Sequence, residues 1–148
     1  MHRLKPTMST SIPPIKKYMT AEVQTIGDQQ PMSVAHRLMK EQRIRHLPVL
    51  HQGELVGLVG DRDLRLVEEL KHADPTRVTV REVMARQPYV VGPDAELDEV
   101  VATMAAKQHS AAVVSNNGKV VGIFTTVDAC RTLAEVHTIW LSRDSRKD

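Results

Sequence analysis

Val120-Val121-Gly122-Ile123-Phe124-Thr125-Thr126-Val127-Asp128 is the stretch that decides how this chain folds, because a short apolar strand runs directly into a helix there. Val, Ile and Phe next to turn residues are typical of a strand, and the residues after Thr125 follow helical spacing. Gly122 removes a side chain from the strand, which leaves room for another backbone or for a ligand. We therefore predict a strand-to-helix junction with an open position in its strand.

Thr125 and Asp128 at this junction have two interpretations. Their spacing is that of a capping box, in which both side chains bond free backbone groups at the start of a helix. The amides at a helix start can also hold an anion. The residues by themselves leave both the cap and the ligand-binding group open.

The same pattern occurs once more, 65 residues earlier in the chain. A gapless shift by that length superimposes eight identical residues, among them Met19 on Met84, Gly57 on Gly122 and Asp63 on Asp128. Each copy is predicted to form an extended segment, a helix, two strands and a second helix. One copy covers only one face of its sheet, so we expect two copies to pack sheet to sheet about an approximate two-fold axis. Their two junctions would then face one cleft, the usual place for a ligand.

The repeat predicts the organisation of the whole chain. Its parts are a flexible N-terminal tail (1–14), a first repeat (15–71), a linker (72–79), a second repeat (80–140) and a C-terminal tail (141–148).

Composition excludes several classes of protein. The 148 residues are 41% hydrophobic and 26% charged with a net charge of +2, which disfavours nucleic acid as a partner. No apolar run approaches the roughly 20 residues that span a bilayer, and we expect no secretory signal because no apolar core follows the basic residues at the N-terminus. The single cysteine, Cys130, fits the reducing cytoplasm, and its place in a helix predicts a buried small hydrophobic side chain. Seven histidines are scattered without metal-ligand spacing, so no metal site is expected.

Both copies resemble the CBS domain, and residues 15–140 are similar to a tandem CBS pair, or Bateman module, of the stand-alone bacterial type. The resemblance implies an α+β fold of two layers, in which each repeat has a three-stranded sheet and two helices and the repeats pack with pseudo-two-fold symmetry. It rests on segments that occur in order in both copies: Met19-Thr20, Ile44 to Val49, Gly53 to Val59 and Asp61 to Leu64 in the first, and Gly118 to Asp128 in the second.

The resemblance also implies a function. CBS pairs typically bind an adenosine-containing compound (AMP, ADP, ATP, S-adenosylmethionine or NAD) in the cleft between repeats, and they regulate rather than catalyse. No obligatory cofactor is implied. We expect a homodimer, with Trp140 and Leu141 as candidate anchors, and a separate effector protein as partner.

Two ligand sites follow from the resemblance, each joining one junction to the other repeat. In the family an Asp binds the ribose hydroxyls, and a carboxylate suits that task because it accepts two hydrogen bonds. The first site would comprise Thr125, Val127 and Asp128 with Val23, Thr25, Ile44, Arg45 and His46. The second would comprise Gly60, Arg62 and Asp63 with Tyr89, Val90, His109, Ser110 and Ala111.

The two sites differ in how well they match the family pattern. Gly60 stands where the family usually has Ser or Thr, so we expect the first site to be the better one. Other interpretations remain open: Arg45 and Arg62 as solvated charges, and Asp63 as a carboxylate favoured at a helix start. Ile44 and Val90 are expected in the core in either case. The alternative function is a ligand-free dimerisation or interaction scaffold, and an enzyme has little support because no nucleophile and base are paired and no P-loop is present.

Overall fold

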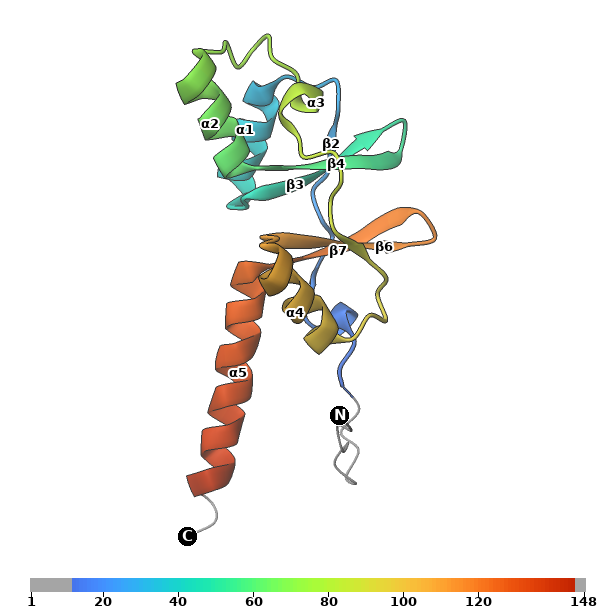
Figure 1. Cartoon of the computed structure of the whole chain (residues 1–148), viewed down its shortest axis with the longest axis vertical. Coiled ribbons are helices and arrows are strands. Elements are labelled where there is room, and N and C mark those ends of the chain that lie inside the picture. Colours follow the sequence, from blue (N-terminus) through green and yellow to red (C-terminus); the bar gives the residue numbers. More distant parts are fainter. Residues whose placement is uncertain (1–11, 146–148) are drawn as a thin grey trace.

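A computed structural model describes residues 12–145, with the side chains of residue 71 and of residues 137–145 excepted. Two small sheets lie face to face in the middle of the molecule, and the helices cover their outer faces (Figure 1). The mixed α+β fold with two related repeats is therefore confirmed. Most of the predicted tail (1–11) and the side chains of Trp140 and Leu141 lie outside the described residues.

The first sheet has the strand order β2-β3-β4 and the second has the order β1-β7-β6-β5. In each, a parallel strand pair adjoins an antiparallel hairpin. The elements of the first half are η1 (Ile15–Lys17), β1 (Thr20–Ala21), β2 (Ile26–Gly27), α1 (Met32–Gln42), β3 (His46–His51), β4 (Glu54–Gly60) and α2 (Asp61–Lys71). Those of the second half are α3 (Val80–Val83), β5 (Val90–Val91), α4 (Leu97–Lys107), β6 (Ala111–Asn116), β7 (Lys119–Thr125) and α5 (Thr126–Ser145).

Both hairpins use the same two-residue turn. Gln52 and Gly53 have φ of 49° and 83°, and Asn117 and Gly118 have φ of 52° and 80°. Positive φ at both central residues is the signature of a type I′ turn, which matches the right-handed twist of the strands that it joins. The turn sets the register of each hairpin, and both strand-to-helix junctions consequently lie on the same side of the molecule, at the left in Figure 1.

Each repeat completes the core of the other. Ile15, at the start of the first repeat, is fully buried among Val100, Met104 and Phe124 of the second. Val80 of the second repeat is fully buried in the core of the first. The exchange also includes backbone pairing, because β1 joins β7, and Ala85 forms an isolated bridge with Leu58 of β4. The fourth strand of the second sheet thus comes from the first repeat.

A methionine covers the glycine at the centre of each hairpin. A Cβ on Gly122 would collide with the thioether of Met19, and a Cβ on Gly57 would collide with the thioether of Met84. The open position predicted at Gly122 is therefore filled by the opening segment of the other repeat and not by a ligand. Met19 and Met84 are themselves equivalent under the 65-residue shift, so the same methionine–glycine contact occurs in both repeats.

A buried carboxylate holds the start of the second repeat against the first repeat. Asp28, 3% exposed, accepts hydrogen bonds from Arg81 Nη1 at 2.8 Å and Gln29 Nε2 at 3.3 Å, and it contacts His51 Nδ1 at 3.0 Å. Burial by itself would raise the pKa of Asp28, but the bonds from these three side chains outweigh it and leave the pKa below its usual value of 3.8. The predicted linker is accordingly packed: the Met32 amide donates to the Val78 carbonyl at 2.8 Å.

Two side chains differ from their predicted burial. Cys130 is exposed and Val90 is 44% exposed. The predictions for Cys130 and Val90 are therefore wrong. Cys130 lies in the first turns of α5 but on the face opposite the buried Asp128 and Thr132, so helical spacing alone does not show which face of a helix is buried. Val90 lies in the two-residue edge strand β5, which leaves its side chain uncovered. Among residues 12–145, no helix combines the length and apolar character needed to cross a membrane.

We predict that Gly57→Ala lowers the free energy of unfolding by about 1–3 kcal/mol, as overpacking of a well-packed core does. The new Cβ would lie 2.7 Å from the Ala85 carbonyl oxygen, which is backbone and cannot turn aside. Urea denaturation measures the change. Gly92→Ala is the matched control, because nothing lies within 4 Å of a Cβ at Gly92. Equal stability of the two variants would show that the Gly57 contact does not hold the repeats together.

We predict that Asp28→Asn lowers the melting temperature at pH 7 and that the difference from wild type shrinks in acid. A carboxyl whose pKa is lowered in the folded state stabilises the fold above its unfolded pKa, and this stabilisation is lost as the pH falls through the folded pKa. The difference should therefore decline below about pH 4. Asp94→Asn is the control, since Asp94 forms only an exposed ion pair with Lys16. A pH-independent difference for Asp28→Asn would contradict the charged role of Asp28.

Candidate functional site

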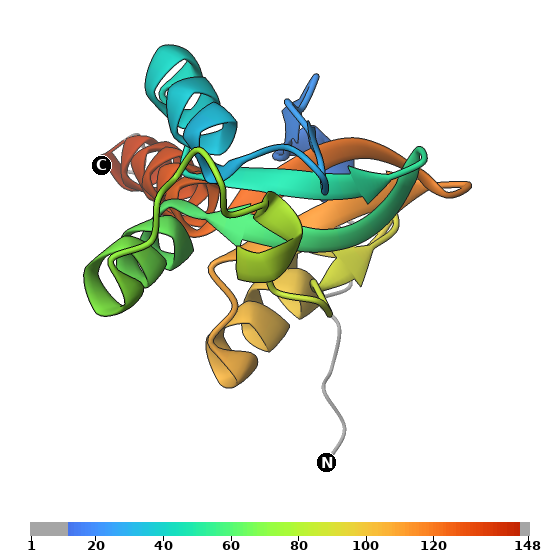
Figure 2. The same cartoon turned by 90° about the horizontal axis from the view of Figure 1, so that it is seen from above.

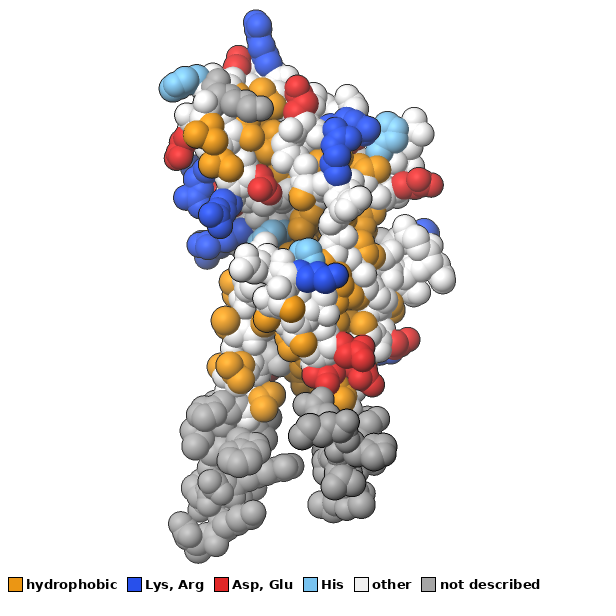
Figure 3. Space-filling view, viewed as in Figure 1, with side chains coloured by type: hydrophobic (Ala, Val, Ile, Leu, Met, Phe, Trp, Pro, Cys, Tyr) orange, Lys and Arg blue, Asp and Glu red, His pale blue; other side chains and the backbone are white. Residues whose placement is uncertain are grey.

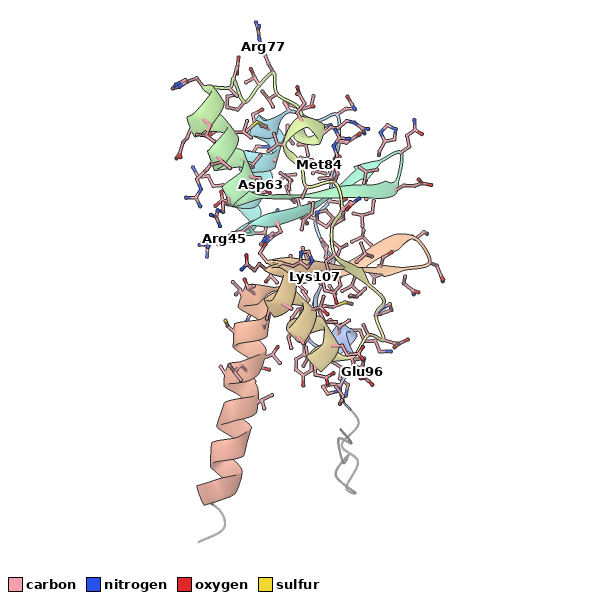
Figure 4. All side chains as sticks on the ribbon, viewed as in Figure 1. Arg45, Asp63, Arg77, Met84, Glu96 and Lys107 are labelled. Carbon is pink, nitrogen blue, oxygen red and sulfur yellow. The ribbon has the colours of Figure 1, made fainter. Side chains whose placement is uncertain are left out.

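A cleft of about 1210 Å³ lies between the repeats, at the ends where β4 runs into α2 and β7 runs into α5. We call it the inter-repeat cleft. Figure 3 shows this hollow between the upper and lower halves, and in Figure 4 the labelled side chains Arg45 and Asp63 lie on the upper half where α2 begins. Both strand-to-helix junctions contribute to its lining.

The structure brings most of the predicted site residues into this cleft. Thr25 and Val90 are the two that do not line it. The predicted residues that line it are Val23, Ile44, Arg45, His46, Arg62, Asp63, Tyr89, His109, Ser110, Ala111, Thr125, Val127 and Asp128. Ile44 is half-buried and packs against the first core, as expected. Whether these residues bind a ligand stays a prediction.

Asp128 makes a full set of hydrogen bonds inside the protein. Its side chain accepts bonds from the Thr125 amide at 2.9 Å, from Thr20 Oγ1 at 3.3 Å and from Arg131 Nη1 at 3.1 Å. The Asp128 amide donates to Thr125 Oγ1 at 3.3 Å, which completes the capping box. With Asp128 only 5% exposed, this carboxylate both caps α5 and ties β1 to the second repeat.

Asp63, its counterpart in the first repeat, has fewer hydrogen-bond partners inside the protein. Its side chain accepts one hydrogen bond, from the Gly60 amide at 2.9 Å, and it is half-buried. The 65-residue shift explains the difference, because the three groups that surround Asp128 have counterparts without a side-chain donor. Thr20, Thr125 and Arg131 correspond to Ala85, Gly60 and Leu66. Carboxylate oxygens of Asp63 are therefore open toward the cleft, whereas those of Asp128 are already bonded.

A polar contact joins the two repeats at the cleft, because His46 Nε2 of the first lies 2.9 Å from Ser110 Oγ of the second. Within the second repeat, the rings of Tyr89 and His109 stack beside it with centroids 5.2 Å apart. Burial lowers the pKa of His46 below 6.5; the nearby Asp63 opposes the shift and Arg45 adds to it. His46 is thus neutral at pH 7 and can both donate and accept a hydrogen bond.

The cations of the cleft belong mainly to the first repeat. Arg65 pairs with Asp61 at 2.9 Å, and Arg131 pairs with Asp128 at 3.1 Å. The side chains of Arg43, Arg45 and Arg62 are exposed and form no ion pair within the described part of the chain. Figure 3 shows Lys and Arg side chains gathered at one mouth of the cleft, at the left of the view. The mouth therefore carries uncompensated positive charge.

The residues predicted from sequence did not include Arg43 and Thr20, which also line the cleft. Arg43 lines the cleft because it ends α1 in the left-handed conformation with φ of 55°, which turns the chain back toward β3. Thr20 reaches Asp128 across 108 positions of sequence, and no local pattern signals such a contact. Its pairing with Ala85 under the 65-residue shift is the one available hint. Within residues 12–145, no three His, Cys, Asp or Glu side chains are grouped to hold a metal ion.

Comparison with known proteins agrees with the two-repeat fold. A family model described as CBS domain matches residues 15–69 and 80–135. The CBS domain-containing protein YhcV of Bacillus subtilis is 30% identical over 114 residues, which are 77% of this chain and 81% of YhcV. Inosine-5′-monophosphate dehydrogenase of Korarchaeum cryptofilum is 30% identical over 122 residues, 82% of this chain but only 24% of that enzyme.

Two solved structures share the fold. The CBS domain pair of MJ0100, in complex with 5′-methylthioadenosine and S-adenosyl-L-methionine, has a TM-score of 0.77 and 24% identity and covers 84% of this chain and 98% of its own. CBSX2 in complex with AMP has a TM-score of 0.70 and 22% identity, with coverage of 84% and 98%. At these identities, the likeness establishes the arrangement of the elements.

Proposed function

The chain belongs to the CBS-domain family, and on that premise we propose that it is a regulatory module that binds an adenosine-containing ligand in the inter-repeat cleft. The ligand would be one of AMP, ADP, ATP, S-adenosylmethionine or NAD. The structures of the MJ0100 pair and of CBSX2 contain ligands of this chemical class, which supports the proposal. The bound module would signal to a separate effector protein in the cytoplasm.

The observation that carries the proposal is the composition of the cleft. It combines a carboxylate with open acceptors (Asp63), half-buried apolar groups (Ile44 and Tyr89) and unpaired guanidinium groups within one hollow of about 1210 Å³. A nucleotide needs these three kinds of partner for its ribose, its base and its phosphates. The structure does bring one hydroxyl and one imidazole together in the cleft, Ser110 Oγ and His46 Nε2 at 2.9 Å. The catalytic alternative has less support than ligand binding, because no carboxylate among the described residues is hydrogen-bonded to His46 to orient it as a base.

Binding would act on the arrangement of the two repeats. The cleft is lined from both sides, so a ligand that contacts both junctions favours one relative position of the repeats over others. Only such a difference in affinity between arrangements can transmit a signal. The exchanged opening segments would transmit the shift, because Met19 and Met84 each lie on the sheet of the opposite repeat.

A homodimer is part of the proposal. Large apolar side chains are exposed along α2 and α5, which lie on the same side of the molecule in both Figure 1 and Figure 2. They are Leu66, Leu70, Val127, Leu133 and Val136. Exposed apolar groups on both helices favour burial against another surface, and a second copy supplies the same surface in return.

The ligand panel tests the function directly. We predict that at least one of AMP, ADP, ATP, S-adenosylmethionine and NAD raises the melting temperature. At a hundredfold excess over the dissociation constant the added stability is about 2.7 kcal/mol. Guanosine nucleotides at equal concentration serve as the control for charge alone. If none of the five adenosine compounds moves the melting midpoint, the ligand-free scaffold is the better description.

Light scattering coupled to size-exclusion chromatography tests the dimer. We predict that the wild-type chain elutes as a dimer and that the double variant Leu70→Glu/Leu133→Glu elutes as a folded monomer, because charge on both helices opposes burial. Both side chains are more than two thirds exposed, so neither substitution disturbs a core. A monomeric wild type, or a double variant that stays dimeric, would exclude this face as the dimer interface.

A further inference from the structure

Resting on the proposed function, we infer that the cleft takes one nucleoside diphosphate or triphosphate per chain. Its ribose hydroxyls would bond Asp63, and its phosphates would lie on the unpaired cations at the mouth of the first repeat. We call these cations the arginine track; they are Arg62, Arg45, Arg43 and, beyond them, Lys40.

The number of ligands follows from the unequal carboxylates. Two ribose-binding carboxylates would allow two ligands, one at each junction. Asp128, however, is 5% exposed and already bonded to Thr20, Thr125 and Arg131. A ribose could displace these partners only by breaking the bonds that join β1 to the second repeat. Asp63 has one internal bond and needs no such rearrangement.

The position of the phosphates follows from the unequal charge of the repeats. Arg43, Arg45 and Arg62 are exposed around the Asp63 junction, and none is in an ion pair within residues 12–145. The corresponding positions of the second repeat hold Gln108, Ser110 and Val127, which carry no charge. Guanidinium groups bind phosphate through paired, charge-assisted hydrogen bonds. Among the described residues, the unpaired guanidinium groups that line the cleft thus lie on the first repeat, where a multiply charged anion would bind.

The length of the phosphate chain follows from the shape of the track. The cleft shares Arg43, Ile44, Arg45 and Asp61 with a second hollow of about 500 Å³ beside α1 and α2. Lys40 and His36 line the far part of this hollow. An anion that enters from the cleft thus meets cations over an extended path. A monophosphate would contact only the arginines nearest the ribose, whereas a diphosphate or triphosphate would also reach the cations farther along the arginine track.

The same charges discriminate against other adenosine compounds. S-adenosylmethionine carries a sulfonium cation, an ammonium group and one carboxylate, so its net charge is positive and the guanidinium groups would repel it as a whole, although they would attract the carboxylate. Adenosine and 5′-methylthioadenosine have no anionic group for the track. The predicted order of affinity is ATP and ADP first, then AMP, with adenosine and S-adenosylmethionine last.

Isothermal titration calorimetry of the full chain tests the inference. We expect one ATP per chain and at least tenfold weaker binding of AMP. Arg45→Gln should weaken ATP binding by about tenfold or more, since it removes a charge-assisted hydrogen bond to the phosphates. The same substitution should leave adenosine affinity unchanged. Arg77→Gln removes the same charge from an exposed loop far from the cleft, as the label in Figure 4 shows, and should change neither affinity.

A second pair of variants locates the ribose. Asp63→Asn should weaken ATP and adenosine alike, whereas Asp128→Asn should lower the melting temperature but leave one ATP bound. Two ATP per chain, equal affinity for ATP and AMP, or loss of binding in Asp128→Asn alone would overturn the inference while leaving an adenosine-binding module. Absence of binding by every adenosine compound would overturn the proposed function as well, so the two failures are distinguishable.

Discussion

The contact of a methionine thioether with a strand glycine, made once in each repeat, is the interaction on which the rest of the structure depends. Met84 lies on Gly57 and Met19 lies on Gly122, so each sheet is covered by the opening segment of the opposite repeat. A three-stranded repeat of this size is marginally stable by itself. The exchange puts Ile15 and Val80 into cores that would otherwise be incomplete, and the two repeats consequently fold as one body.

The exchange also explains how two similar repeats came to have different chemistry. β1 places Thr20 beside Asp128, whereas the equivalent segment of the second repeat places Ala85, which has no hydroxyl, near the Asp63 junction. One carboxylate is therefore used to hold the structure together and the other is left open to the cleft. A pseudo-two-fold scaffold thus carries an asymmetric site, with its unpaired cations on the side of the open carboxylate.

Much of the fold could be predicted from the sequence, because the repeat, the strand pairs and the hairpin glycines are local patterns that occur twice. The cleft and most of its lining followed from the family resemblance. The exchange itself could not be predicted, since Met19 and Thr20 precede the strand pattern and make their contacts more than a hundred residues away. The sequence pattern at Thr125 and Asp128 matches the family motif better than the pattern at Gly60 and Asp63 does. It could not show that Asp128 is bonded to Thr20 and that Asp63 is the carboxylate with unused acceptors. Exposure of Cys130 depends on which face of α5 turns toward the sheet: Asp128 and Thr132 are buried, and Cys130 lies on the opposite face.

A crystal structure of the chain grown with ADP tests the central claim, an open ribose site in the first repeat, most directly. The account predicts one nucleotide in the inter-repeat cleft, with both ribose hydroxyls within hydrogen-bond distance of the Asp63 carboxylate and with Asp128 still bonded to Thr20. Electron density that places the ribose on Asp128, or a nucleotide bound outside the inter-repeat cleft, would contradict it.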